Sequence, residues 1–509
     1  MPTSPEPSPP PSAPPAIGAG AERRLHPWSW VFVLVQQLKQ FIVPLAVLLF
    51  LGRGDRHALW PLAGVAALAL VSAWQYFTYR YSVGDDRLVV RSGLLERSLR
   101  QIPFARIHNV ALHQTLLHRL FGVAEVRLES AGGQKPEAEM RVLRLQDALA
   151  LERLIRRRGH VAADPSGTAA EAADGELLLA LPTSEVVRLG LISNRGMVVV
   201  GGAFALAWQV FPERSMQRFM QQLGEQALGY ASHLEGGWPA RVAGVAALVL
   251  LALVLLRLFS VLLALLQYHG FRLEAHGRRL TVTRGLLTRV RTSASRRRMQ
   301  AWTLREGPLH RLFGRRALHV DTAVVEQQEG QQRSLRELAP IATPQRCDEL
   351  VGHVLPRVAW PPREWHALHP RAWQRLAPPG LLFTAVLLAI ACGRFGAWGL
   401  LALAWAPWSL LVARQHARRA GYAVDERLVA VREGWWSRHW RFAEIDKLQA
   451  VELRRSPLDR RFGMASVWLD TAGAGSMSPP LRIRLLPQAE ARALHARLAR
   501  EVAGRRLRW

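Results

Sequence analysis

Six runs of apolar residues interrupt an otherwise polar and basic chain. They cover residues 28–51, 59–78, 190–211, 239–266, 380–395 and 397–413. A helix of about 20 residues crosses the roughly 30 Å hydrocarbon layer of a membrane, so the first four runs are long enough and the last two are short but plausible. Because the runs come in pairs, the pattern predicts six transmembrane helices arranged as three pairs.

The polar stretch that follows each pair has the period of β-strands. In "VAEVRLES" (Val123 to Ser130), apolar residues alternate with polar neighbours, as in a half-buried strand. Each stretch closes with a helical pattern; in the second, Cys347 and Val351 share one face after the capping residues Thr343 and Pro344. We expect an α+β membrane protein in which each helical pair precedes a small antiparallel barrel or sandwich of about seven strands with a C-terminal helix.

A short motif recurs in all three polar stretches. The sequence HRLFG occurs at 118–122 and at 310–314, and DRRFG occurs at 459–463. In each copy a glycine lies 28 residues before the phenylalanine, and an acidic residue lies eight residues after it. Ungapped spacing of this kind indicates an internal duplication. The motif positions are Gly93, Phe121 and Gly122 in the first copy, Gly285, Phe313 and Gly314 in the second, and Gly434, Phe462 and Gly463 in the third.

The motif residues are interpreted as structural. The glycines at 93, 285 and 434 fall between strand-like runs and are interpreted as hairpin residues with positive φ. The phenylalanines are interpreted as core anchors, and the glycines after them as turns into the next strand. The alternative, that Phe-Gly marks a ligand site, stays open.

These patterns define the expected domain boundaries. They are a proline-rich disordered tail (1–25), helical pair 1 (26–78), module 1 (79–158), a linker (159–188), helical pair 2 (189–267), module 2 (268–356), a juxtamembrane segment (357–379), helical pair 3 (380–413) and module 3 (414–509).

The distribution of charge predicts the topology. The chain carries a formal net charge of +28, and residues 414–509 hold 20 basic against 10 acidic residues. Residues 213–237, between two apolar runs, hold two basic and three acidic residues. Since basic segments stay on the cytoplasmic side of membranes, all three modules and both termini are expected in the cytoplasm, with residues 212–238 outside.

Two groups of basic residues are candidate functional positions. Lys39 and Arg257 interrupt apolar runs, and an ionisable residue inside a membrane is a functional hypothesis by default; the alternative is that Lys39 ends a juxtamembrane amphipathic stretch and that Arg257 extends toward lipid headgroups. Arg289, Arg291, Arg296, Arg297 and Arg298 concentrate charge in the second module and are candidate contacts to anionic headgroups, against the alternative of an ordinary solvated face.

No pattern of catalytic, cofactor-binding or metal-binding residues stands out. The sequence has no HExxH, phosphate-binding loop or nucleophile elbow. His108, His113 and His118 recur every five residues, which suits neither a helix face nor a strand face, so no metal site is expected there. The net charge favours nucleic acid, but no helix-turn-helix or aromatic RNA-binding pattern supports that reading, so no nucleic-acid partner is expected.

The paired apolar runs followed by a β-rich unit with "QIPFARIHNV" and "HRLFGVAEVRLESAGG" resemble the membrane-flanked bacterial pleckstrin-homology-like (PH-like) domain proteins of the YdbT type, which carry three copies. The resemblance covers the chain except residues 1–25 and the acidic linker near 160–180. It implies PH-like barrels, a multi-pass location in the plasma membrane of a bacterium and no enzymatic activity. The later copies depart from the pattern, with Ser295 and Glu444 at the position of Pro103.

Two function classes remain at this point. In the first, the modules bind membrane lipids or scaffold partners, which would be other membrane proteins or a second copy of the chain. In the second, the protein is a component of a transport or export system, although few polar residues line the predicted spans.

Overall fold

The computed structural model describes residues 78–84, 86–92, 98–104, 107–130, 138–161, 175–211, 213–232, 237–322, 335–472 and 479–504, with a few positions before residue 78. Most of the first predicted helical pair, together with Lys39 and Gly93, lies outside the described residues. The chain divides into two compact units, residues 1–170 and 171–509.

The first unit holds the first copy of the repeat. Its elements are β1 (Arg23–Arg24), β2 (Arg80–Val83), β3 (Arg87–Ser92), β4 (Ser98–Pro103), β5 (Ile107–Gln114), α3 (Leu116–Leu120), β6 (Val123–Ser130), β7 (Ala138–Arg144) and α4 (Leu145–Val161). The strands β1 to β4 pair in sequence order, and so do β5 to β7, all antiparallel. Apolar residues such as Leu88, Val126 and Leu128 are buried with Leu151 of α4, so the alternating pattern forms the core as expected.

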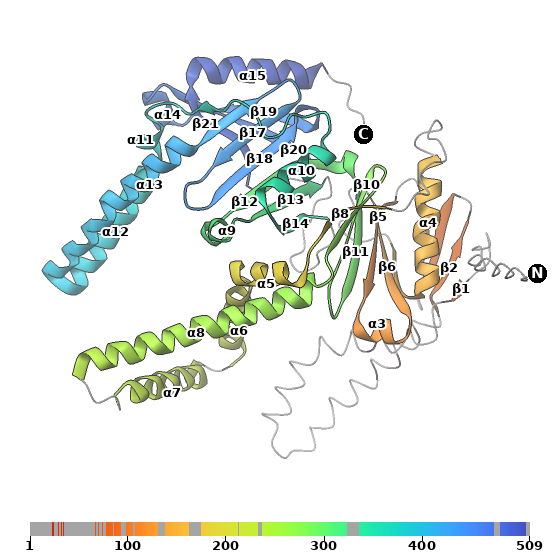
Figure 1. The fold of residues 1–509 in the computed structure, drawn as a ribbon, viewed down its shortest axis with the longest axis horizontal. Coiled ribbons are helices and arrows are strands. Elements are labelled where there is room, and N and C mark those ends of the chain that lie inside the picture. The colour runs from red at the N-terminus through yellow and green to blue at the C-terminus, as the bar shows by residue number, and fades with distance from the viewer. Residues whose placement is uncertain are drawn as a thin grey trace, which may run out of the picture. The chain divides into compact units, whose positions relative to one another are not determined.

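The second copy lies in the second unit (Figure 1). Before its helical pair comes β8 (Glu176–Ala180). The pair itself contains α5 (Thr183–Ile192), α6 (Arg195–Val210), α7 (Glu213–Ser232) and α8 (Gly237–Tyr268). The module follows with β9 (Arg272–His276), β10 (Arg279–Arg284), β11 (Arg289–Ser295), η3 (Arg296–Arg298), β12 (Met299–Glu306), α9 (Pro308–Leu312), β13 (Arg316–Thr322), β14 (Glu337–Ala342) and α10 (Pro344–Val354).

The third copy repeats this order. It begins with β15 (His366–Ala367), α11 (Ala372–Leu376), α12 (Pro378–Phe395), η4 (Gly396–Ala404) and α13 (Trp405–Arg419). The module follows with β16 (Gly421–Val424), β17 (Leu428–Glu433), β18 (Arg438–Glu444), η5 (Ile445–Lys447), β19 (Leu448–Arg454), α14 (Pro457–Arg461), β20 (Met464–Thr471), β21 (Leu481–Pro487) and α15 (Gln488–Ala503). Each copy thus has seven described strands and a closing helix, as the sequence predicts.

One strand of every copy precedes the helical pair rather than following it. β1 pairs with β2, β8 with β9 and β15 with β16, all antiparallel. In the second copy, Leu181 N also donates to Phe271 O across the whole helical pair, at 3.1 Å. The chain therefore leaves each module and returns to it at neighbouring points, and the segments 159–188 and 357–379 contribute a strand to the module beside them.

The second and third modules share a sheet. β12 pairs with β18, with Trp302 opposite Phe442 and Leu304 opposite Trp440. Arg441 is buried in this seam, where it donates to Thr303 Oγ1 at 2.9 Å and to Asp321 Oδ2 at 2.7 Å. A buried charge needs such partners, and those of Arg441 lie in the other module. The second and third modules are therefore joined through a common sheet and a buried ion pair.

Two helical stretches in the described part of the chain are long and apolar enough to cross a membrane, Val242–Tyr268 and Pro378–Arg419. A third span would be formed by Thr183–Ile192 together with Arg195–Gln209, which are bent by 53° at the break between them. The structure supports a membrane protein with fewer recognisable spans than the six that the sequence predicts, and the first predicted pair is mostly outside the described residues.

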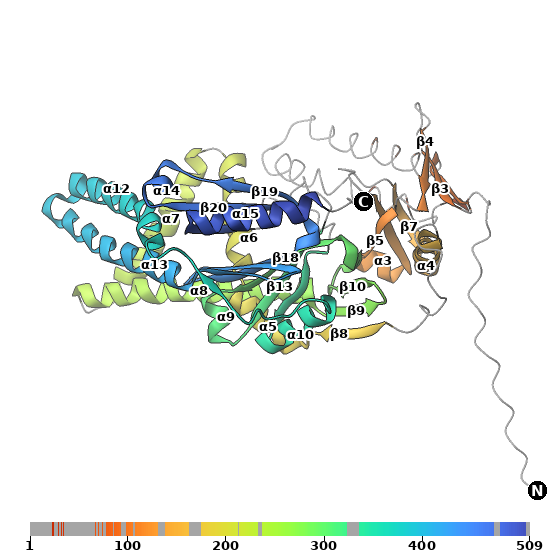
Figure 2. The ribbon, with the colours of Figure 1, turned by 90° about the horizontal axis from the view of Figure 1, so that it is seen from above.

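The stretch Pro378–Arg419 turns back on itself. Gly396 has φ +59°, and a Cβ placed on Gly380 would lie 2.8 Å from the Cβ of Ser409. α12 and α13 are therefore antiparallel neighbours, as Figure 2 shows. α12 has 18 residues, which is about 27 Å of helix, so each arm is close to the minimum for a crossing.

The prediction that the motif phenylalanines anchor the core is wrong for Phe121 and Phe313, whose side chains are 39% and 36% exposed. Each is the C-cap of a short helix, α3 or α9, where the helix ends at the surface. Phe462, the C-cap of α14, is half-buried beside Met464 and Leu485. The strand after each motif supplies the core residues, because the chain turns inward only after the following glycine.

The motif glycines that the structure describes adopt the backbone conformation expected of them. Gly285 and Gly434 have φ of +109° and +89°, and a Cβ on either would lie within 2.0 Å of a carbonyl oxygen. Gly122, Gly314 and Gly463 have φ between +60° and +67°. L-residues rarely adopt these values, so the repeated glycines are explained by backbone geometry.

Candidate functional site

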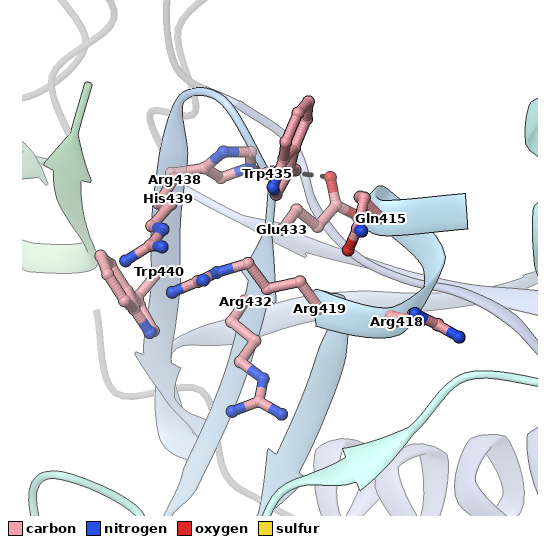
Figure 3. A pocket seen from close by; sticks show the side chains of 9 residues that line it. All are labelled: Gln415, Arg418, Arg419, Arg432, Glu433, Trp435, Arg438, His439 and Trp440. Atoms are coloured by element: carbon pink, nitrogen blue, oxygen red, sulfur yellow. Dashed lines mark ion pairs between the residues drawn. The ribbon is translucent and has the colours of Figure 1, made fainter. Parts of the chain in front are cut away.

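A basic cavity of about 430 Å³ lies where the last span enters the third module (Figure 3). Its lining residues come from the end of α13 and from the β17–β18 hairpin. They are Gln415, Arg418, Arg419, Arg432, Glu433, Trp435, Arg438, His439 and Trp440. We call it the arginine pocket.

The local sequence explains how the pocket forms. The last turn of α13 carries Arg418 and Arg419, and cations are favourable at the C-terminus of a helix. Gly434 then reverses the chain, so that Arg432 lies opposite Trp440, and Glu433 opposite His439, in the antiparallel register. Figure 3 shows the Arg419 side chain extending from the end of α13 toward the strand that carries Arg438 and Trp440.

Positive charge dominates the pocket. Glu433 is the single carboxylate in its lining, and it pairs with His439 at 3.6 Å. Burial would raise the pKa of Glu433, but His439, Arg484 and Arg482 together lower it, so this group stays an anion. Arg438 pairs with Glu306 at 3.2 Å. Three of the pocket arginines, at 418, 419 and 432, have no carboxylate within 4.0 Å in the part of the chain that the structure describes.

Partial burial makes the positive charge of the pocket less favourable still. It lowers the pKa of Arg432, since the charged guanidinium is partly removed from water. The guanidinium carbon of Arg432 lies 4.9 Å from the ring centre of Trp365, a cation–π contact that offsets part of that cost. An anion in the pocket would supply the missing negative charge and accept several N–H bonds at once.

The pocket lies beside a candidate membrane span. Trp435 packs edge-on against Trp408 of α13, with ring centres 6.1 Å apart, and Trp408 belongs to the stretch Pro378–Arg419. Tryptophans are common at the level of lipid headgroups. The geometry therefore suits an anionic group at the membrane surface, a phosphate above all, because arginine forks match phosphate oxygens.

The five arginines predicted as one headgroup site are not brought together. Arg289 lies at the start of β11, near the end of α8, whereas Arg296, Arg297 and Arg298 lie past its far end. Seven residues of strand separate these ends by about 20 Å. Arg291 lies between them in β11 and pairs in register with Thr283.

Arg296 to Arg298 are engaged within the protein. Arg296 donates to His353 at the end of α10, and Lys447 donates to Arg297 O at 3.1 Å. Burial lowers the pKa of Arg298 to about 10. One of the five predicted arginines, Arg289, occupies the same position in the repeat as the pocket residue Arg438. Arg289 lies four residues after Gly285, and Arg438 lies four residues after Gly434.

Arg257 has a structural role that the sequence did not specify. Its Nη1 donates to Leu191 O at 3.1 Å, to Ser193 O at 3.2 Å and to Asn194 Oδ1 at 3.1 Å. These oxygens lie at the break between α5 and α6, where helical hydrogen bonds end. The Arg257 guanidinium therefore donates to carbonyl oxygens that the break between α5 and α6 leaves without helical partners.

Sequence reasoning missed the arginine pocket. Its residues come from a helix end and a hairpin, and they meet only after the hairpin folds back on α13. Two signals could have found it: the basic run "ARQHARR" (413–419) directly after the last apolar run, and the match of Arg438 with Arg289 in the repeat.

Comparison with known proteins gives two findings. The sequence profile described as "Bacterial PH domain" matches three regions, residues 33–159, 228–346 and 379–502. The UPF0699 transmembrane protein YdbT of Bacillus subtilis (strain 168) is 21% identical over 423 residues, which is 79% of this chain and 83% of that protein. No solved structure gives a significant match.

Proposed function

Because the chain belongs to the Bacterial PH domain family, with three copies that cover most of its length, we propose that it holds three PH-like modules at the cytoplasmic face of a bacterial plasma membrane. In this proposal six helices cross the membrane in three pairs, and both termini are cytoplasmic. The paired strands β8–β9 and β15–β16 support it, because they bring both ends of a helical pair to one module and hence to one side.

The proposed activity is binding rather than catalysis. The third module binds the phosphate of an anionic phospholipid headgroup in the arginine pocket, and the modules together act as a membrane-surface scaffold. The observation that carries this proposal is the set of pocket arginines without a carboxylate partner among the described residues, placed beside Trp408 of a candidate span.

Lipid binding to the full chain in detergent tests the proposal. The probes are short-chain phosphatidylglycerol, short-chain phosphatidylcholine and inorganic phosphate. Phosphatidylglycerol should bind most tightly; tight binding of phosphate alone would show that the pocket serves a soluble anion instead. In the variant with Arg418→Gln and Arg432→Gln, affinity for phosphatidylglycerol should fall by roughly tenfold per arginine, as expected when a charge-assisted hydrogen bond is lost.

The matched control is Arg497→Gln, which removes one positive charge from the same module. Arg497 donates to Asp425 O at the β16–β17 turn, at the opposite end of the strands from the pocket. Binding should be unchanged in this variant. A loss of binding free energy in the control half as large as that in the doubly substituted pocket variant would mean that net charge alone governs binding, and an unaffected pocket variant would contradict the proposed site.

A further inference from the structure

Six large apolar side chains of the second unit are exposed at the ends of four short elements. Leu286 and Leu287 form the β10–β11 turn, Leu312 and Phe313 end α9, Trp436 lies in the β17–β18 turn, and Leu458 lies in α14. Their exposed fractions run from 36% for Phe313 to 75% for Leu312. We call this set the apolar rim. Water is an unfavourable environment for so many leucine and aromatic side chains on one surface.

Three of the four rim elements make a contact at the base of a helical pair. Leu286 N donates to Leu266 O in the last turn of α8, at 2.9 Å. Just after α9, Arg315 pairs with Glu185 in the first turn of α5, at 2.7 Å. In α14, Asp459 pairs with Arg375 at 2.9 Å. Arg375 lies three residues before the start of α12. The rim therefore lies at the level where the candidate spans meet the modules.

The rim is continuous between the second and third modules. Arg311 Nη2 of α9 donates to Trp436 O in the β17–β18 turn, at 2.9 Å. Figures 1 and 2 show α9 and α14 on the same side of the second unit as α8, α12 and α13. Elements distant in sequence thus lie at the end of the second unit that carries the candidate spans.

The first copy repeats the arrangement independently. Phe121, which ends α3, lies edge-on to Phe32, with ring centres 6.2 Å apart, and Phe32 also lies 4.2 Å from the ring of His118. Phe32 belongs to the first predicted span, residues 28–51. In the first unit, too, the HRLFG helix contacts the base of a predicted span.

From these contacts we infer that the apolar rim inserts into the interfacial layer of the bilayer, so that the second and third modules rest on the membrane through the short motif helices α9 and α14 and the hairpins at Gly285 and Gly434. Leucine and aromatic side chains flanked by arginines are typical of surfaces that lie at the boundary between headgroups and acyl chains. Arg289, Arg311 and Arg460 flank the rim in this way.

The bilayer is the proposed occupant because the rim is fixed beside the ends of candidate spans. Gly285 N donates to His269 O at 3.0 Å, and His269 directly follows α8. The β10–β11 turn is therefore hydrogen-bonded to the end of the candidate span Val242–Tyr268. In every copy the motif, HRLFG or DRRFG, builds a short helix that ends at the motif phenylalanine.

Lipid-borne quenching tests the inference on the full chain. Cys347 and Cys392 are replaced by alanine, and a single cysteine at Leu312 or at Leu177 carries an environment-sensitive fluorophore. Leu177 is the matched control, because it is 53% exposed and lies in β8 opposite Glu274, toward the far end of the strands from α8. Each labelled chain is placed in nanodiscs of phosphatidylcholine with and without nitroxide-labelled lipid.

Fluorescence at position 312 should be blue-shifted and lost when nitroxide lipid is present, whereas fluorescence at position 177 should be quenched by aqueous iodide alone. Iodide quenching at 312 equal to that at 177, without lipid quenching, would overturn the inference. Shielding of 312 from both quenchers would also overturn it, since a second copy of the chain would then cover the rim. The neutral lipid separates this test from the arginine pocket, which requires an anionic headgroup.

Discussion

Replacing Phe442 by alanine should destabilise the seam between the second and third modules far more than replacing the motif residue Phe313. Phe442 is fully buried in β18. Its ring stacks on Trp360 with centres 4.0 Å apart, and on Trp302 with centres 6.4 Å apart and planes 8° from parallel. Phe313 is 36% exposed and caps a five-residue helix.

The expected magnitudes follow from these environments. Loss of a fully buried phenylalanine costs about 3–5 kcal/mol, which includes the cavity that remains. Two stacked aromatic partners place Phe442 in the upper part of that range. Phe313 loses only part of its contact with water on folding and leaves no enclosed cavity, so Phe313→Ala should cost about 1 kcal/mol.

Hydrogen–deuterium exchange of the full chain in nanodiscs measures the difference locally. The amides of β12 and β18 bond across the seam, with Trp302 opposite Phe442. Since about 1.4 kcal/mol corresponds to a factor of ten, Phe442→Ala should speed their exchange roughly a hundredfold or more, and Phe313→Ala by less than tenfold. Similar exchange rates in the two variants would refute the assignment of Phe442 to the core and of Phe313 to the surface.

Three further outcomes are expected. A cysteine at Ser215 should react with a membrane-impermeant thiol reagent in intact cells and one at Glu426 only after permeabilisation, in a chain without its two native cysteines; the reverse would contradict the topology. Gly434→Ala should lower the thermal unfolding temperature, because its φ is +89° and the new Cβ would meet Ser437 O, whereas Gly352→Ala in α10, with open space around it, should not. Burial lowers the pKa of His319 to about 4 from 6.5, so the unfolded chain binds a proton first as the pH falls. Up to about 2–3 kcal/mol of stability should then be lost between pH 6.5 and 4, and His319→Gln should flatten that slope in urea unfolding measured at several pH values.

Local patterns in the sequence predicted the parts of the fold that depend on local chemistry. The hairpin glycines Gly285 and Gly434 are explained by backbone sterics, and the closing helix with Cys347 on its buried face is explained by helical spacing. The phenylalanine prediction failed because a spacing repeated within one chain does not show whether a side chain points into the core or toward solvent. Phe313 ends a helix at the surface, and only the structure shows this.

Pairing between distant segments could not be predicted. β8 pairs with β9 across the whole second helical pair, and no local pattern connects Glu176 with Ala275. The break between α5 and α6 was likewise hidden inside one apolar run, and Arg257 on another helix satisfies it. The arginine pocket belongs to the same class, since a helix end and a hairpin supply its charges.

The second and third copies carry residues of opposite charge at an equivalent position of the repeat. The residue before the hairpin glycine is Arg284 in the second copy and Glu433 in the third. Arg284 pairs with the half-buried Glu337 at 2.6 Å and lies over the ring of Tyr268, and Arg195 pairs with Glu337 at 3.1 Å. Burial alone would raise the pKa of Glu337, but these arginines lower it to about 2.

The second copy therefore neutralises its arginines with its own carboxylate, at the joint between the module and α8. In the third copy the carboxylate Glu433 is held by His439 and by arginines outside the pocket, so Arg418 and Arg432 are left without an acidic partner among the described residues. A site that lacks internal neutralisation is open to an external anion, whereas a neutralised site is a structural joint. Of these two copies, the third is accordingly the one that we expect to bind ligand.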